Sequence, residues 1–161
     1  MACSAYSLGC LGAQWDDLPR AFSHHITKAA TIKPLTDQQF SNTLYGLSLM
    51  QAKWVGFHSS LREALLNNLA EETVFQENIP QHVSNSIWSL SKMDAPWSEM
   101  PIENIQRSVI RCSDRFSHQE LANTIYGIAQ MEAIWSEISL DVALSLEISL
   151  KVLADQMTVQ V

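Results

Sequence analysis

Ser41–Trp54, SNTLYGLSLMQAKW, is the stretch that decides the fold, because close copies of it recur along the chain. The copies are Ser84–Trp97, SNSIWSLSKMDAPW, and Ala122–Trp135, ANTIYGIAQMEAIW, and a degenerate copy, Tyr6–Trp15, reads YSLGCLGAQW. In every copy an aromatic residue precedes the closing Trp by nine positions, at 6 and 15, 45 and 54, 88 and 97, and 126 and 135. These aromatic residues are 39, 43 and 38 positions apart. A recurrence at this spacing is typical of a repeat protein.

The composition is that of a folded chain. Hydrophobic residues make up 47% of the 161 positions and charged residues only 17%, which excludes a disordered chain. The net charge of −7 argues against non-specific binding to nucleic acid, since affinity for phosphates comes largely from Lys and Arg. Three cysteines without ligand-like spacing predict a reducing compartment and no disulfide framework. No apolar run reaches the length of a membrane span.

The amino-terminal segment begins inside a repeat. Only five residues precede Tyr6, whereas at least nine helix-compatible residues precede the aromatic of each complete copy. The segment lacks the charged leading region of a secretory signal and the Arg residues of a transit peptide. We therefore expect a partial array, a fragment of a longer protein. Its expected divisions are a partial repeat (1–33) and three repeats (34–77, 78–115 and 116–161).

Each copy is predicted to form an amphipathic helix. In the first complete copy the helix is expected to start at the N-cap pair Thr36-Asp37 and to run to about Lys53. Its rotation places large apolar residues on one face and small residues on a second stripe, where a neighbouring helix can approach closely. The apolar face comprises Phe40, Leu44, Leu47, Met50 and Trp54; Val83, Ile87, Leu90, Met93 and Trp97; and Leu121, Ile125, Ile128, Met131 and Trp135. The small stripe comprises Ser41, Ser48 and Ala52; Ser84, Ser91 and Ala95; and Ala122, Ala129 and Ala133.

A second helix is predicted after each copy. The first follows Trp15, the second spans Ser60–Glu72 before a lengthened loop near Gln76–Pro80, and the third follows Pro101. The segment from Ile138 alternates with period two, as strands do, but its place in the repeat predicts a helix. Helical pairs of this length cannot bury their faces alone. We therefore predict an all-α fold, a right-handed α-α superhelix (solenoid) of stacked helix-turn-helix repeats, with an all-α globular bundle as the alternative.

The motif resembles the octotricopeptide repeat, a helical-pair repeat. The resemblance rests on Phe116–Met131, FSHQELANTIYGIAQM, and on Gln38–Tyr45 and Gln81–Trp88, and it covers nearly the whole chain. The closing Trp residues and the one long inter-repeat segment depart from the family pattern. The resemblance implies sequence-selective binding of single-stranded RNA in post-transcriptional RNA processing, stability or translation, in chloroplasts or mitochondria. No segment resembles the RAP domain that many members carry.

One polar face of the motif helices holds the candidate RNA-binding residues. Asn is a mediocre helix former, yet it stands at the same mid-helix position in three copies. Modular RNA-binding repeats read one base per repeat, so an unvarying Asn would supply a common contact and the varying positions would discriminate. Alternatively, the Asn residues form a ladder that hydrogen-bonds the adjacent helix. The varying positions are Gln39/His82/Glu120 and Leu49/Lys92/Gln130. The candidate RNA-binding residues are Gln38, Gln39, Asn42, Gln81, His82, Asn85, Lys92, Gln119, Asn123 and Gln130.

Two further groups of side chains have competing interpretations. The motif aromatics either stack on bases or pack neighbouring helices. Three arginines spaced four residues apart on a second helix either touch phosphates or form a solvated face. The aromatics are Tyr45, Trp88 and Tyr126, and the arginines are Arg107, Arg111 and Arg115.

The sequence gives little support for catalysis. Five His residues fall at different repeat positions without a metal-binding pattern, Cys112 has no partner at a recognisable spacing, and the glycines form no phosphate-binding loop. We expect no enzyme, cofactor, metal or small-molecule substrate. The alternative to RNA binding is a protein-interaction scaffold, which the acidic balance favours. Carboxylates along the Asn positions would argue for the scaffold.

Overall fold

The computed structural model describes residues 2–32, 34–71 and 79–158. Over these ranges the chain contains eight α-helices, five short 3-10 turns and no strand, so the prediction of an all-α fold is confirmed. The α-helices are α1 (Ala2–Cys10), α2 (Arg20–Ile32), α3 (Asp37–Leu49), α4 (Ser59–Ala70), α5 (Pro80–Lys92), α6 (Ile102–Cys112), α7 (His118–Gln130) and α8 (Leu140–Thr158). The 3-10 turns are η1 (Trp15–Asp17), η2 (Trp54–Gly56), η3 (Trp97–Glu99), η4 (Ser113–Arg115) and η5 (Trp135–Glu137).

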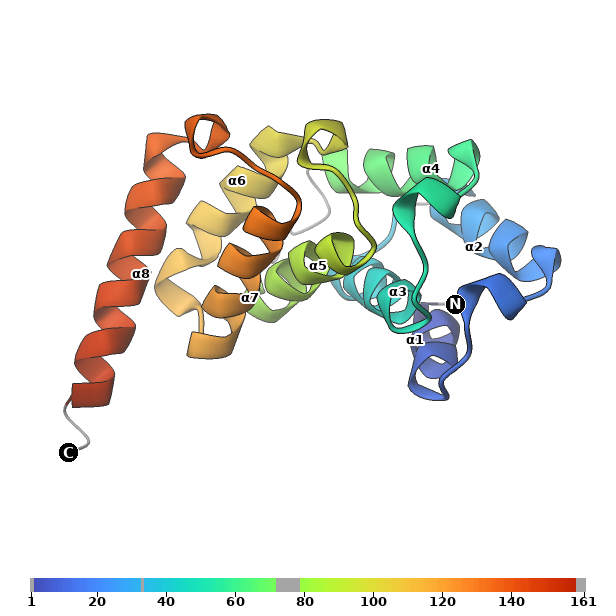
Figure 1. The fold of residues 1–161 in the computed structure, drawn as a ribbon, viewed down its shortest axis with the longest axis horizontal. Helices are drawn as coiled ribbons and strands as arrows, with labels where there is room; N and C mark the ends of the chain where they lie inside the picture. The colour runs from blue at the N-terminus through green and yellow to red at the C-terminus, as the bar shows by residue number, and fades with distance from the viewer. Residues whose placement is uncertain (1, 33, 72–78, 159–161) are drawn as a thin grey trace.

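The helices alternate between two rows (Figure 1). The odd-numbered helices carry the repeated motif, and we call them the motif helices; α1 packs on α3, α3 on α5 and α5 on α7. The even-numbered helices follow the closing Trp residues, and we call them the connecting helices. Among them α2 packs on α4 and α6 packs on α8. The chain thus has a repeat-like helical arrangement, with α1 and α2 at one end and α7 and α8 at the other (Figure 1).

The motif helices begin where the sequence predicts. The Thr36 hydroxyl accepts a hydrogen bond from the N–H of Gln39, and the Gln39 side chain accepts one from the N–H of Thr36, which forms a capping box. Ser117 and Glu120 form the same box at the start of α7. Helix α5 begins instead with Pro80, whose fixed φ suits the first helical turn.

The motif helices end earlier than predicted. Helix α3 was expected to reach Lys53 but ends at Leu49. The N–H of Ala52 donates to the carbonyl of Leu47 over 3.1 Å, and Gln51, directly before Ala52, has a left-handed backbone, as in a Schellman motif. Trp54 therefore starts a separate 3-10 turn. The left-handed residues at this position of the four copies are Gly12 (φ 79°), Gln51 (φ 58°), Asp94 (φ 57°) and Glu132 (φ 65°).

The predicted apolar face forms the core, with two exceptions. All ten of its residues in the first two complete copies are buried. In the third copy Ile125 is only half-buried, and Trp135 is 75% exposed, so the prediction of a buried Trp135 is wrong. The reason is that Trp54 and Trp97 are covered by the following unit, whereas no described residue covers Trp135 in this way. The small residues Ala122 and Ala129 are exposed for the same reason.

Consecutive motif helices approach closely at glycine. A Cβ on Gly46 would lie 2.4 Å from the carbonyl carbon of Ala5, and one on Gly127 would lie 2.8 Å from Cγ2 of Ile87. The backbone N–H of each of the first three closing Trp residues also bonds to the end of the next motif helix: that of Trp15, for example, donates to the carbonyl of Met50 over 2.9 Å. These contacts fix the spacing between units.

The connecting helices differ from the predictions in detail. Helix α4 begins one residue earlier than expected and ends at Ala70 rather than Glu72. The period-two segment after Ile138 forms helix α8, so the prediction of a helix there is confirmed. Most of the lengthened loop predicted near Gln76–Pro80 lies outside the described residues. None of the helices in the described ranges is long and apolar enough to cross a membrane.

Candidate nucleic-acid interface

Four positions of each motif helix form one continuous line on its surface. They lie seven and three residues before the aromatic, at the aromatic itself, and four residues after it, within about 60° of the helix circumference. We call this line the amide–aromatic stripe. It comprises Gln38, Asn42, Tyr45 and Leu49 on α3; Gln81, Asn85, Trp88 and Lys92 on α5; and Gln119, Asn123, Tyr126 and Gln130 on α7.

The repeated Asn side chains are half-buried and have no partner among the described residues. Asn42, Asn85 and Asn123 share the same intermediate exposure, and their amide groups make no hydrogen bond to other described parts of the chain. The alternative of an Asn ladder bonded to the adjacent helix is therefore not observed in this part of the chain. An amide carries two donors and one acceptor, so these groups are available to water or a ligand.

The aromatic residues of the stripe contact one another from helix to helix. The ring centroids of Tyr6 and Tyr45 are 5.9 Å apart, and the two ring planes are stacked at an angle of 25°. The ring centroids of Tyr45 and Trp88 are 5.7 Å apart, and their planes meet at 49°. The Lys92 Nζ lies 5.4 Å from the Trp88 ring centroid and 5.3 Å from that of Tyr126, which is a cation–π arrangement on both sides. The aromatics thus pack neighbouring helices, while Tyr126 keeps 48% of its surface exposed.

The candidate RNA-binding residues Gln39 and His82 lie beside the stripe rather than on it, at the position that Glu120 occupies on α7. Gln39 accepts the N–H of Thr36 over 3.2 Å, and Glu120, at the same position of α7, accepts the N–H of Ser117 over 2.8 Å. His82 occupies this position in α5; it is half-buried, and its Nδ1 has no partner among the described residues. The position serves helix capping in two of three copies. The varying position that shares the stripe is therefore Leu49/Lys92/Gln130.

The stripe carries one charge and no carboxylate. Its single charged residue is Lys92. At the end of α5 the Asp94 carboxylate pairs with Lys53 Nζ over 2.6 Å. The other described carboxylates of the motif helices are the buried Asp37 and the capping Glu120. The remaining acidic residues of the described ranges lie in turns, at helix ends and on the connecting helices, which leaves the stripe neutral or positive.

The three arginines lie in the other row of helices. Arg107 and Arg111 are exposed on α6, and Arg115 is exposed in η4. The Arg115 guanidinium donates to the carbonyl of Arg111 over 3.0 Å and lies 3.6 Å from the Asp114 carboxylate. This basic surface is separate from the motif helices that carry the Asn residues.

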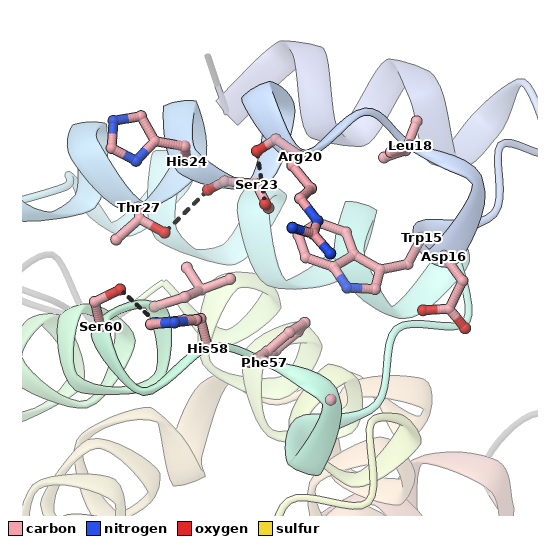
Figure 2. A pocket seen from close by; sticks show the side chains of 12 residues that line it. Trp15, Asp16, Leu18, Arg20, Ser23, His24, Thr27, Phe57, His58 and Ser60 are labelled. Atoms are coloured by element: carbon pink, nitrogen blue, oxygen red, sulfur yellow. Dashed lines mark hydrogen bonds between the residues drawn. The ribbon is translucent and has the colours of Figure 1, made fainter.

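A polar groove of about 950 Å³ lies between α2 and α4 (Figure 2). Trp15, Arg20 and His24 line one side, and His58 and Gly56 line the other. All of its charged and imidazole side chains are exposed. This groove is not predictable from the helical periodicity of the sequence. The feature of the sequence that marks the groove is Gly56, two residues after the closing Trp54. The other copies carry an acidic residue at this position: Asp17, Glu99 and Glu137.

The described part of the chain contains no cluster of metal ligands. No group of three or more His, Cys, Asp or Glu side chains within it is placed to hold an ion. Cys112 is fully buried, and burial raises the pKa of its thiol to about 11. A thiol with this pKa stays protonated at neutral pH, and the protonated form is a poor nucleophile.

Comparisons of the chain with protein-family models, with curated proteins and with solved structures find no match.

Proposed function

We propose that this chain binds single-stranded RNA along the amide–aromatic stripe, as a segment of an α-solenoid with the post-transcriptional role that its repeat resemblance implies. One observation carries the proposal. Asn42, Asn85 and Asn123 occupy equivalent positions beside an aromatic ring, are half-buried, and bond to no described residue. Packing gives no reason for an amide at these three positions, whereas a ligand with hydrogen-bonding edges does.

The chemistry of the stripe suits unpaired bases. An Asn amide can donate and accept at once, as the Watson–Crick edge of a base requires, and exposed aromatic edges add stacking surface. The amide is common to all three units, so it would make a shared contact. Discrimination between bases would come from Leu49, Lys92 and Gln130, which present an apolar group, a cation and an amide at one position.

Because Lys92 is the single cation of the stripe, we expect the affinity for RNA to depend only weakly on salt concentration. For single strands, the slope of log K against log salt is about −0.7 for each neutralised phosphate. With Lys92 as the only charged residue of the stripe, we expect a slope of about that size from the stripe, and binding dominated by hydrogen bonds and stacking. Lys92→Gln should remove this slope, whereas Lys151→Gln on α8 should leave it unchanged.

The test is selection from a randomised single-stranded RNA pool by the whole chain and by the triple variant Asn42→Ala/Asn85→Ala/Asn123→Ala. Asn67→Ala is the matched control, because Asn67 is an exposed amide on connecting helix α4. We expect a short enriched motif with the parent chain and the control, and none with the triple variant. Far-ultraviolet circular dichroism melts of all three proteins establish that the variant remains folded. Failure of the parent to bind RNA at low salt would refute the proposal and favour a protein-interaction scaffold.

A further inference from the structure

The groove between α2 and α4 lacks a carboxylate that the next unit of the chain supplies for itself. One unit further along, the Glu99 carboxylate accepts the indole N–H of Trp54 over 2.8 Å. In the α2–α4 groove the equivalent donor is the indole of Trp15, and the position equivalent to Glu99 is Gly56. A Cβ at Gly56 would meet no described atom within 4 Å, so the place that a carboxylate takes in one unit is open in the other.

The indole of Trp15 is held beside the Gly56 turn. Its backbone N–H donates to the carbonyl of Met50, as that of Trp54 donates to the carbonyl of Met93, and each Trp starts a 3-10 turn. The Trp15 ring packs edge-on against Phe57, the residue after Gly56, with the ring centroids 5.3 Å apart. The indole N–H of Trp15 makes no hydrogen bond to a described residue, so it is available to an acceptor that enters the groove.

Arg20 adds a charged donor to the same groove. It is the first residue of α2, it is exposed, and its guanidinium makes no hydrogen bond or ion pair with a described residue. Figure 2 shows the side chains of Arg20 and Trp15 both extending into the space between α2 and α4. A guanidinium can bind a carboxylate through two parallel hydrogen bonds. The other copies carry Ser59, Ile102 and Leu140 at this position, so the arginine occurs only in the unit whose groove lacks the Glu.

The charge and length of the groove favour a peptide over a nucleic acid. The exposed Asp16 also lines the groove and balances the charge of Arg20, whereas a polyanion such as RNA needs several cations. On α2 the lining runs from Arg20 to Thr27, which is about 10 Å at 1.5 Å per residue. That length matches about three residues of an extended peptide.

From these observations we infer that the α2–α4 groove binds a peptide segment of a partner protein through a glutamate side chain. The glutamate carboxylate accepts the indole N–H of Trp15 and pairs with the Arg20 guanidinium, and it takes the place that Glu99 occupies beside Trp54. Asp16 repels every carboxylate, and it disfavours an acidic run more than a single glutamate. The inference does not rest on RNA binding.

The test is a titration of the whole chain, without RNA, followed by two-dimensional ¹H–¹⁵N NMR of its five indole N–H groups. The Trp15 resonance is the one that disappears in Trp15→Phe. The probe is the capped tripeptide Ala-Glu-Ala, added to millimolar concentration, and the matched control is capped Ala-Gln-Ala. We expect the Trp15 resonance to move progressively downfield with the glutamate peptide and to stay in place with the glutamine peptide.

Four substitutions in and beside the groove identify the groups involved. Gly56→Glu should move the Trp15 resonance in the absence of peptide and abolish its response to the probe, whereas Gly56→Ala should retain the response. Arg20→Gln should weaken binding by up to about fivefold, as expected for an exposed ion pair. Lys28→Gln, which removes an exposed charge from the same helix, should leave binding unchanged. Circular dichroism melts establish that each variant is folded.

Several results would overturn the inference. The first is a Trp15 resonance that stays in place with the glutamate peptide, or that moves equally with the glutamine peptide. The second is an unchanged response in folded Gly56→Glu. An equal response to acetate at the same concentration would show that the peptide contributes nothing, and a larger response to oligouridylate would assign the groove to phosphates.

Discussion

The indole N–H of Trp54 donates a hydrogen bond to the Glu99 carboxylate over 2.8 Å, and this bond joins two units across 45 residues of sequence. The neighbouring closing Trp residues do not make the equivalent bond within the described part of the chain. The buried Nε1 of Trp97 has no partner among the described residues, because Glu137 accepts the N–H of Ile134 over 3.2 Å instead. At Trp15 the equivalent position is Gly56, which offers no side chain, and the groove between α2 and α4 is open there.

Replacing Glu99 by Ala should destabilise the chain. The Trp54 side chain is buried, so the substitution leaves its indole N–H without an acceptor, which costs about 1–3 kcal/mol in the free energy of unfolding. Urea denaturation measures the change. Glu103→Ala is the control, because Glu103 is exposed on α6 and should change stability by no more than about 0.5 kcal/mol. Equal effects of the two substitutions would show that the Trp54–Glu99 bond contributes nothing.

Replacing Gly56 by Glu should stabilise the chain by supplying the missing acceptor. A Cβ at Gly56 would meet no atom within 4 Å, so the new side chain has room beside Trp15. Any non-glycine residue here also restricts the unfolded chain, which stabilises by about 0.4–1 kcal/mol. Gly56→Ala measures the contribution of the restricted unfolded chain alone, because alanine adds no hydrogen-bond acceptor. The additional gain from Glu should disappear in a Trp15→Phe background; if it persists there, the gain does not come from the indole.

The repeat made much of the fold predictable. Periodic apolar residues located the motif helices, and Thr36 marked the start of α3 correctly. The helix end was missed because a left-handed Gln51 has no strong sequence signal, although Gly12 occupies the same position in the first copy. Trp135 was wrongly assigned to the core because burial of a closing Trp depends on the next unit rather than on its own sequence.

The candidate site was predicted in part. The Asn positions and Lys92 fall on one stripe, as periodicity requires, but sequence could not show that the Asn amides lack partners. It also could not separate a base-reading position from a capping position. The capping box places Gln39 in the second role, and this depends on the backbone geometry at Thr36.

Replacing Gly46 by Ala should force α1 away from α3. The new Cβ would lie 2.4 Å from the carbonyl carbon of Ala5 and 2.5 Å from the backbone nitrogen of Tyr6, neither of which can move aside by a rotamer change. Overpacking of this kind costs about 1–3 kcal/mol. Thermal unfolding monitored by circular dichroism measures the loss, and Gly56→Ala, in open space, is the matched control. Unchanged stability would mean that the close approach of α1 and α3 is wrong.

Stability should fall in alkaline solution because of Cys112. Its thiol has a pKa of about 11 in the folded chain, raised from 9.0 by burial. Between these values the unfolded chain has released the proton and the folded chain has not, so rising pH favours unfolding. The free energy of unfolding of the parent, relative to Cys112→Ala, should be constant below about pH 8 and decrease from about pH 9 to about pH 11. A pH-independent difference would contradict the burial of this thiol.

The most direct test of the account is to map where RNA lies on the folded chain. Photo-crosslinking with single-stranded RNA that contains 4-thiouridine, followed by mass spectrometry, identifies the attached peptides. We predict cross-links on α3, α5 and α7 at Tyr45, Trp88 and Tyr126, which lie beside the three Asn amides. Cross-links confined to the arginines of α6 and η4, or to the groove between α2 and α4, would contradict RNA binding by the amide–aromatic stripe.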